Sequence, residues 1–184
     1  RALNREWTEA EKCLKTASEI HGKVGHRRRE VCALLNFADV KFERELYDES
    51  LKFASKAQIT ADEVKALDLQ VRALTLKGNI HRFLKGGNSD KAREFFGKAL
   101  ELSLNLNDVN TLFQLFYSLA KICHSDREYA EASNYYGKAE LILRQIAEGL
   151  EEDRAAKFFE DPRRKVFFED LSRFRKEALG RAEG

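Results

Sequence analysis

One short run of the sequence, His124-Ser125-Asp126, carries the three residue types of a hydrolytic triad. A triad needs these side chains to meet in space, with the histidine between the nucleophile and the carboxylate. Here they are consecutive at the end of an expected helix, where Ser and Asp more naturally cap the next helix. The sequence contains no H-E-x-x-H, G-x-S-x-G, Walker A or G-x-G-x-x-G pattern. We therefore expect no catalytic residues and no enzymatic activity.

The residues that commonly ligate metals are widely spaced. The histidines stand at positions 21, 26, 81 and 124, and the cysteines at 13, 32 and 123, with no C-x-x-C pair. Cys123 falls at a core-facing position, where a thiol behaves as a small hydrophobic group. We predict no metal site and no cofactor. An odd number of scattered cysteines also favours a reducing compartment, so we expect a cytoplasmic protein.

Two basic runs, His26–Arg29 and Arg163–Lys165, each open an expected helix and have acidic residues nearby. Binding of nucleic acid calls for a continuous basic stripe or aromatic stacking platforms, and neither is present. The net charge of the chain is only +2. No apolar run approaches the roughly 18 residues of a membrane span. We therefore expect neither nucleic acid nor a membrane as a partner.

A further set of polar side chains is suited to binding a polypeptide. Asparagine amides can pair with both the N–H and the C=O of a peptide backbone. Arg72, Arg82 and Lys121 can receive acidic side chains or a C-terminal carboxylate, so an acidic partner would suit them. The residues expected to line one binding surface are Asn36, Asp39, Arg72, Thr75, Asn79, Arg82, Gln114, Tyr117 and Lys121. Glu43 and His124 extend two of these rows.

These side chains need helices to position them, and a repeated register predicts those helices. Between Tyr129 and Ala139, residues at steps of three, four and three alternate between large and small. The same register occurs at Trp7, Ala10, Leu14 and Ala17, at Tyr47, Ser50, Ala54 and Ala57, and at Ser89, Ala92, Phe96 and Ala99. The second positions, 10, 50, 92 and 132, lie 40, 42 and 40 residues apart. A fixed period in this range is typical of stacked helical repeats.

Apolar residues at steps of three and four predict helices along the whole chain. The expected ranges are 1–22, 26–43, 47–59, about 60–84, 89–104, 109–124, 128–149, 150–160 and 162–179. Thr60 and Glu63 form a T-x-x-E pair, which predicts a capping box at the start of the fourth helix. Asn88 or Ser89, Asn107 or Asp108, and Asp161 are expected to cap later helices. Loops of two to six residues make successive helices antiparallel.

Small residues on the alternate helices complete a pattern that resembles the tetratricopeptide repeat family. Three copies carry it: Leu74, Gly78, His81, Ala92, Phe96 and Ala99; Phe116, Ala120, Cys123, Ala132, Tyr136 and Ala139; and Leu34, Ala38, Lys41, Ser50, Ala54 and Ala57. Ala54 stands where an aromatic residue is usual, and the period is about 40 rather than the usual 34 residues. Longer-period versions look like those of signalling scaffolds and bacterial regulators.

The resemblance implies an all-α fold, a right-handed solenoid of antiparallel helix pairs closed by C-terminal capping helices. We expect residues 1–149 to form about 3.5 repeats, with the first helix of the first pair missing, and residues 150–184 to form the cap. In such a solenoid the binding residues named above face the concave groove. The clamp used by chaperone-tail binders is present only in fragments, because Leu35, Thr75 and Tyr117 occupy places where basic residues are wanted.

The last expected helix is amphipathic, with Phe167, Leu171, Phe174 and Ala178 on one face. This pattern suits a cap, and a partner-binding or dimerising helix is the alternative.

The sequence therefore predicts a non-catalytic scaffold that binds a protein or peptide in its groove. Because the chain begins at Arg1 and contains no methionine, we expect it to be part of a larger signalling or regulatory protein. The alternative is a structural spacer or self-association module whose exposed edge, at Trp7 and Leu14, produces a homo-oligomer.

Overall fold

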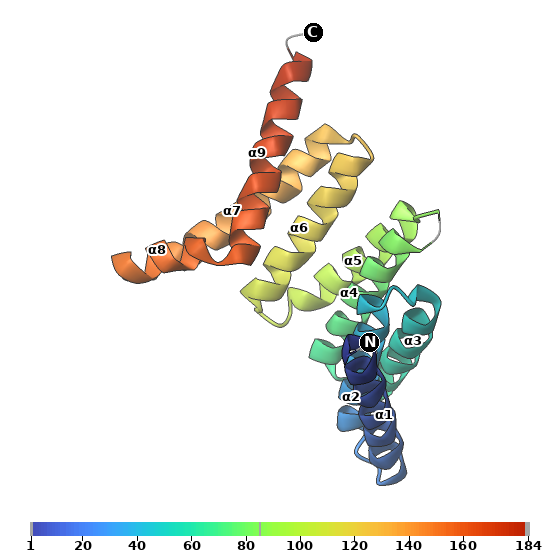
Figure 1. Ribbon diagram of the computed structural model, residues 1–184. Helices are drawn as coiled ribbons and strands as arrows, with labels where there is room; N and C mark the ends of the chain where they lie inside the picture. The colour runs from blue at the N-terminus through green and yellow to red at the C-terminus, as the bar shows by residue number, and fades with distance from the viewer. Residues whose placement is uncertain (1, 85, 183–184) are drawn as a thin grey trace. The chain divides into compact units, whose positions relative to one another are not determined.

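A computed structural model describes residues 2–84 and 86–182, which form nine α-helices and no strand (Figure 1). The helices are α1 (Ala2–Lys23), α2 (Arg27–Glu43), α3 (Tyr47–Glu63), α4 (Leu67–Phe83), α5 (Ser89–Ser103), α6 (Val109–Ser125), α7 (Tyr129–Glu148), α8 (Glu152–Glu160) and α9 (Pro162–Ala182). The expected all-α class is confirmed. None of these helices is both long and apolar enough to cross a membrane.

The chain divides into two compact units, Arg1–Asn107 and Asp108–Gly184. The predicted boundary between repeats and cap, at residues 149 and 150, does not coincide with this division. Helices α8 and α9 belong to the second unit together with α6 and α7. The assignment of residues 1–149 as repeats remains a prediction.

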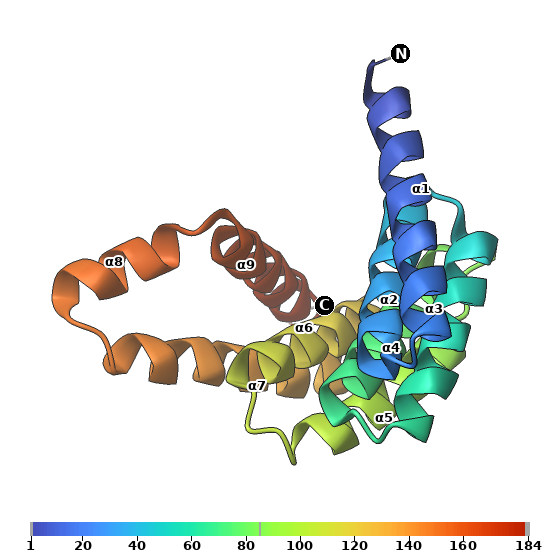
Figure 2. The same cartoon turned by 90° about the horizontal axis from the view of Figure 1, so that it is seen from below.

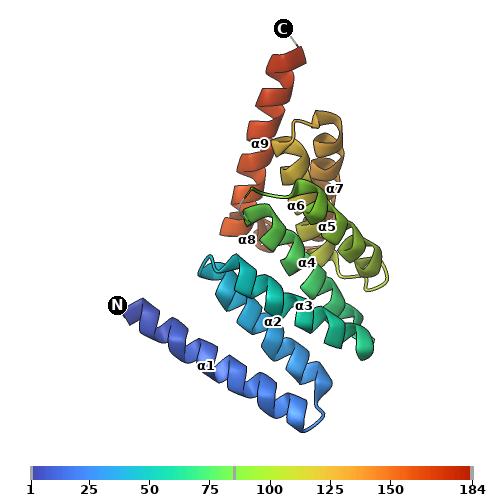
Figure 3. The same ribbon diagram turned by 90° about the vertical axis from the view of Figure 1, so that its right-hand side faces the viewer.

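In the first unit each of the helices α1 to α4 packs against the next one along the chain, and α2 also contacts α4. Figure 3 shows α1 to α4 side by side in chain order. Short loops make neighbours antiparallel. The core consists mainly of aliphatic and small residues from α2, α3 and α4: Val31, Leu34, Leu35, Ala38, Ala54, Ala57, Ala61, Leu69, Ala73, Leu76 and Ile80.

The small residues of the register lie where helices approach closely. Ser50, Ala92 and Ala132 are completely buried. The Ser50 hydroxyl donates a 2.7 Å hydrogen bond to the Ala38 carbonyl, joining α3 to α2. At Gly78 in α4, a Cβ atom would lie only 2.7 Å from the Phe96 ring of α5. The ring therefore occupies the space that the missing side chain leaves.

Several helices end at a residue in the left-handed conformation that is not glycine. Glu45, Lys65 and Arg127 have φ angles of 59°, 53° and 64°. The N–H that follows each one bonds back to the helix, as Ala66 does to the Ala61 carbonyl at 3.0 Å. This is the closure that glycine usually provides.

The predicted capping box at Thr60 and Glu63 is wrong. Both residues lie inside α3, which extends to Glu63, and α4 begins only at Leu67. The Thr60 hydroxyl donates instead to the carbonyl of Lys56, one turn earlier in the same helix, at 3.0 Å. The turn at Lys65, which carries no glycine signal, sets the true boundary.

Three other predicted caps are confirmed, and one is wrong. Asn88 accepts a hydrogen bond from the backbone N–H of Lys91, and Asp108 and Asp161 cap α6 and α9 in the same manner. Ser125 does not cap the next helix, because its hydroxyl donates to the Lys121 carbonyl of α6 at 2.9 Å.

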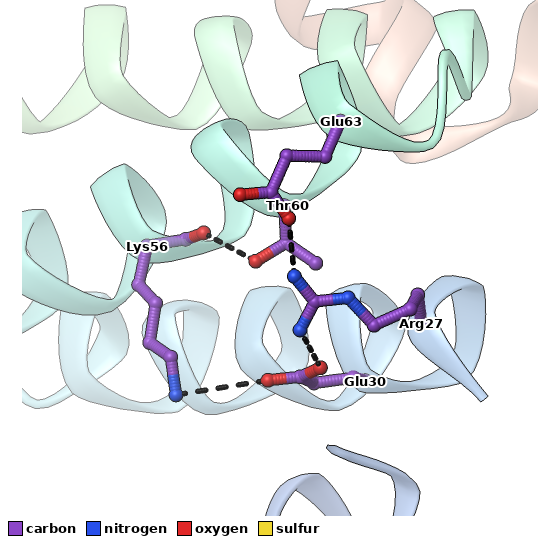
Figure 4. A network of polar contacts seen from close by, with 5 residues as sticks. All are labelled: Arg27, Glu30, Lys56, Thr60 and Glu63. Carbon is purple, nitrogen blue, oxygen red and sulfur yellow. Dashed lines mark hydrogen bonds and ion pairs between the residues drawn. The ribbon is translucent and has the colours of Figure 1, made fainter. Parts of the chain in front are cut away.

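A polar network joins α2 to α3 in the first unit (Figure 4). The buried carboxylate of Glu30 pairs with Arg27 at 2.9 Å and with Lys56 at 3.7 Å. Arg27 also pairs with Glu63, near the end of α3. Burial of a carboxylate without such partners is costly, so these ion pairs favour the packing of α2 against α3.

In the second unit α6 packs against α7, and α8 joins α7 to α9 (Figure 2). The apolar face of α9 is buried as predicted, because Phe167, Leu171 and Phe174 belong to one core with residues of α6 and α7. The Phe167 ring is completely buried, 5.3 Å from Phe113 and 5.2 Å from Tyr117 between centroids. Aromatic packing therefore holds α9 in place.

Candidate functional site

The predicted binding residues of the first unit lie in two rows, on α2 and on α4. We call this surface the α2–α4 strip; it comprises Asn36, Asp39, Arg72, Thr75, Asn79 and Arg82. The steps of three and four along each helix place a row on one face. Leu35 and Ala38 of α2, and Ala73 and Ile80 of α4, are buried in the core. Burial of these neighbours leaves the polar rows at the surface.

Arg72 joins the two rows of the α2–α4 strip. Its Nη2 donates to Asn36 Oδ1 at 2.7 Å and to Asp39 Oδ2 at 2.5 Å. The ion pair with Asp39 balances the arginine charge, so an acidic ligand would have to share or replace that carboxylate. The hydrogen bond to Asn36 occupies the amide oxygen and turns the amide NH₂ group away from Arg72.

Asn79 lies seven residues beyond Arg72 on the same face of α4. Its side chain is half-buried and has no hydrogen-bond partner among the residues that the structure describes. Its amide atoms are not among the buried side-chain atoms that lack a partner, so they remain accessible to water. Such an amide can exchange that water for the backbone groups of a peptide. The side chain of Thr75 is less available, since its hydroxyl donates to the Val71 carbonyl at 2.8 Å. Arg82 lies over the Phe83 ring, 5.6 Å from its centroid.

The predicted binding residues of the second unit lie on α6. Gln114 is exposed, but the Tyr117 hydroxyl donates to Asp170 of α9, and the Lys121 amine lies 4.2 Å from the Tyr117 ring centroid. His124 contacts the carboxylate of Glu177, also on α9, at 2.9 Å. The C-terminal helix of the chain therefore covers much of this predicted surface.

The run His124-Ser125-Asp126 does not assemble into a triad. The imidazole of His124 faces Glu177, while the Ser125 hydroxyl is bonded to the backbone of its own helix. The distances needed for proton relay between these side chains are therefore not present.

The turn between α6 and α7 brings together a group that the sequence analysis missed. The Cys123 sulfur and one carboxylate oxygen each from Glu128 and Glu131 lie within 4.8 Å of one another. The Cys123 sulfur lies 3.8 Å from Glu131 Oε2. Only the left-handed turn at Arg127 makes these residues neighbours, and no sequence pattern indicates that turn. Among the described residues these three donors are one fewer than the four protein ligands of a structural zinc site.

Two ion pairs to the buried carboxylate of Glu140 anchor α9 in the second unit. Glu140 of α7 pairs with Arg144 at 2.7 Å and with Arg175 of α9 at 2.6 Å. Burial of the Glu140 carboxylate acts to raise its pKa, but the two guanidinium groups outweigh this effect and lower the pKa below the usual value. The carboxylate is therefore charged at neutral pH and ties α9 to α7.

The predicted self-association edge lies on α1. Trp7 and Leu14 are half-buried rather than open to solvent. The large apolar side chains that are exposed at this end of the first unit are Ile20 and Val24, which are 52% and 57% exposed.

One solved structure provides a comparison for the fold. The crystal structure of BtubC (BKLC) from P. vanneervenii is similar to this chain, with a TM-score of 0.75 and 18% sequence identity. The match covers 97% of this chain and 68% of that chain. At this identity the likeness is one of fold, in keeping with an all-α, helical-repeat-like architecture. No protein-family model matches the chain, and no curated protein matches its sequence.

Proposed function

We propose that this chain is a tetratricopeptide-like protein-interaction domain that binds an extended peptide on the α2–α4 strip. In this proposal the helix pairs form a right-handed solenoid, and the chain serves a larger signalling or regulatory protein of the cytoplasm. The observation that carries the proposal is the pair of surface amides on this strip: that of Asn79, which is accessible to water, and that of Asn36, which is held by Arg72.

The size of the α2–α4 strip fits a short peptide. Residues 72 to 82 of α4 span about 15 Å at 1.5 Å per residue. An extended chain of four or five residues covers the same length at about 3.3 Å per residue. Amides at Asn36 and Asn79 can pair with backbone groups of such a chain, as a sheet edge would. This mode of binding tolerates many side chains and does not require an acidic ligand.

The test begins with selection of peptides from a display library on the wild-type chain. Affinity for a selected peptide is then compared with that of Asn36→Ala and Asn79→Ala. Loss of one hydrogen bond at the surface costs about 1 kcal/mol, so each variant should bind about fivefold more weakly.

Matched controls use exposed residues of other helices. Lys52→Ala in α3 and Glu101→Ala in α5 should leave the affinity unchanged within about twofold, since both side chains are exposed and outside the strip. The proposal fails if these controls weaken binding as much as the asparagine variants do, or if no peptide is selected.

Self-association through the end of α1 is a second candidate, because Ile20 in α1 and Val24 just after it are both exposed. Sedimentation of the wild-type chain should then show a dimer that Val24→Glu converts to a monomer. A wild-type chain that remains monomeric at about 100 μM removes this candidate.

A further inference from the structure

A hollow of about 610 Å³ lies where α8 meets α9 in the second unit. Phe159 lines it from α8. The remaining lining residues all come from α9: Lys165, Phe168, Glu169, Ser172, Arg173 and Lys176. We call this surface the α8–α9 hollow. It takes no part in the α2–α4 strip, which lies in the other unit.

The α8–α9 hollow faces away from the core contacts of α9. Successive residues of a helix are rotated by about 100°, which puts Ser172, Lys165 and Lys176 about 100° to 140° around the helix from the buried Leu171. The buried face of α9 is thus already used by α6 and α7, and the hollow is a second face of the same helix.

The floor of the hollow is aromatic. The Phe159 and Phe168 rings are both half-buried and lie 5.7 Å apart in an edge-to-face arrangement. Phe168 is backed by the buried Phe167 ring at 5.1 Å. An apolar floor supported from behind in this way can receive a large apolar side chain without moving.

The rim of the hollow is cationic. Three basic side chains, Lys165, Arg173 and Lys176, are opposed by the single carboxylate of Glu169. Arg173 is 3.6 Å from Asp170, whereas neither lysine has an ion-pair partner among the residues described. The cations span 12 residues of α9, or about 16 Å along its axis. Carboxylates spaced over three helical turns would match them.

We propose that the α8–α9 hollow binds an acidic segment of a partner polypeptide that packs one aromatic or leucine side chain onto the floor formed by Phe159 and Phe168. Charge complementarity selects the acidic partner, and the aromatic floor provides the anchor. This interaction adds to the function proposed above and does not depend on it, because the two surfaces share no residue.

The probe is a fluorescein-labelled synthetic peptide of glutamates that carries one phenylalanine and two leucines. Two related peptides accompany it: one with lysines in place of the glutamates, and one with serines in place of the apolar residues. The wild-type chain should bind the first peptide at about 0.1 M salt, and each of the other two at least about tenfold more weakly.

Variants of the chain then locate the site. Lys165→Glu combined with Lys176→Glu should weaken binding of the acidic peptide about tenfold, because rim charges steer and hold it. Lys157→Glu combined with Arg163→Glu is the matched control. It changes the net charge equally with exposed residues of the same two helices and should alter affinity by less than about twofold. Phe159→Ser removes the anchor without changing the charge and should also abolish tight binding.

Helical content by circular dichroism must be equal in all variants that are compared. The proposal is overturned if the wild-type chain does not bind the acidic peptide, or if the control variant loses as much affinity as the rim variant. If the serine peptide binds as tightly as the first peptide, the proposed role of an apolar side chain as the anchor is overturned. Tighter binding of a single-stranded oligonucleotide, lost in the same rim variant, would assign the surface to nucleic acid instead.

Discussion

Gly78 illustrates how a single residue decides the spacing of two helices. It is buried in α4, and the Phe96 ring of α5 fills the space beside it. The register in the sequence predicted a small residue here, and the geometry explains why even alanine is too large. The same register predicted the buried Ser50, Ala92 and Ala132. Side-chain size at fixed spacing was therefore a dependable guide at this scale.

Gly78→Ala should destabilise the chain by about 1–3 kcal/mol, because the added methyl group forces Phe96 out of its position. Gly97→Ala in α5 is the control, since a Cβ there meets nothing within 4 Å. The control should gain up to about 1 kcal/mol from helix propensity. Urea unfolding measures both, and equal effects of the two changes would refute this account of the contact.

His81 should make the stability depend on pH. Burial lowers the pKa of its imidazole, and the charges of Lys91 and Lys77 act in the same direction. The unfolded chain therefore takes up a proton near pH 6.5 that the folded chain does not, and the free energy of unfolding falls as the pH decreases below that value. His81→Gln should reduce this dependence in thermal melts between about pH 7.5 and 5.5. An unchanged dependence would contradict the assignment.

Helix ends are the elements that the sequence predicted least well. Caps with side-chain acceptors, such as Asn88 and Asp108, could be predicted because the residue type itself makes the hydrogen bond. The turns at Glu45, Lys65 and Arg127 could not be predicted. Backbone hydrogen bonds alone close them, and glutamate, lysine and arginine seldom adopt the left-handed conformation that they have here. For this reason α3 is four residues longer than predicted, ending at Glu63 rather than at residue 59.

Lys65→Gly tests the left-handed turn between α3 and α4. Glycine relieves the steric cost of a positive φ but loses more entropy on folding, so a net gain of about 0.5–1 kcal/mol is expected. Lys65→Ala retains the Cβ atom and should change the stability by less than about 0.5 kcal/mol. A loss of stability in the glycine variant, measured by urea unfolding, would be inconsistent with this turn.

Helix α9 depends on Phe167 for its position. Phe167→Ala removes a completely buried ring from the core that α9 shares with α6 and α7, at a cost of about 3–5 kcal/mol. Hydrogen exchange should accelerate in α9 and remain unchanged in α2 to α4. Val166→Ala is the neighbouring control, since Val166 is 50% exposed and should matter little. Comparable effects of the two substitutions would mean that α9 is not held by this face.

At the scale of the whole molecule, the all-α class and the order of the helices could be predicted, because apolar residues at steps of three and four indicate each helix directly. For the predicted binding residues, the structure shows their placement. Arg72, Asn36 and Asp39 do meet, as one face of α2 and α4 requires. Tyr117 and Lys121 were assigned to an open groove, but Tyr117 lies against α9. Contacts between residues 53 positions apart depend on tertiary packing, which periodicity does not specify.

The most direct measurement of the central claim is photo-crosslinking with a selected peptide that carries a diazirine at each position in turn. Mass spectrometry of the crosslinked chain should place the adducts on α2 and α4, around Asn36 and Asn79, with lower yield in the double alanine variant of these residues. Adducts concentrated on α3, α5 or α9, with the yield unaffected by that variant, would contradict peptide binding at the α2–α4 strip.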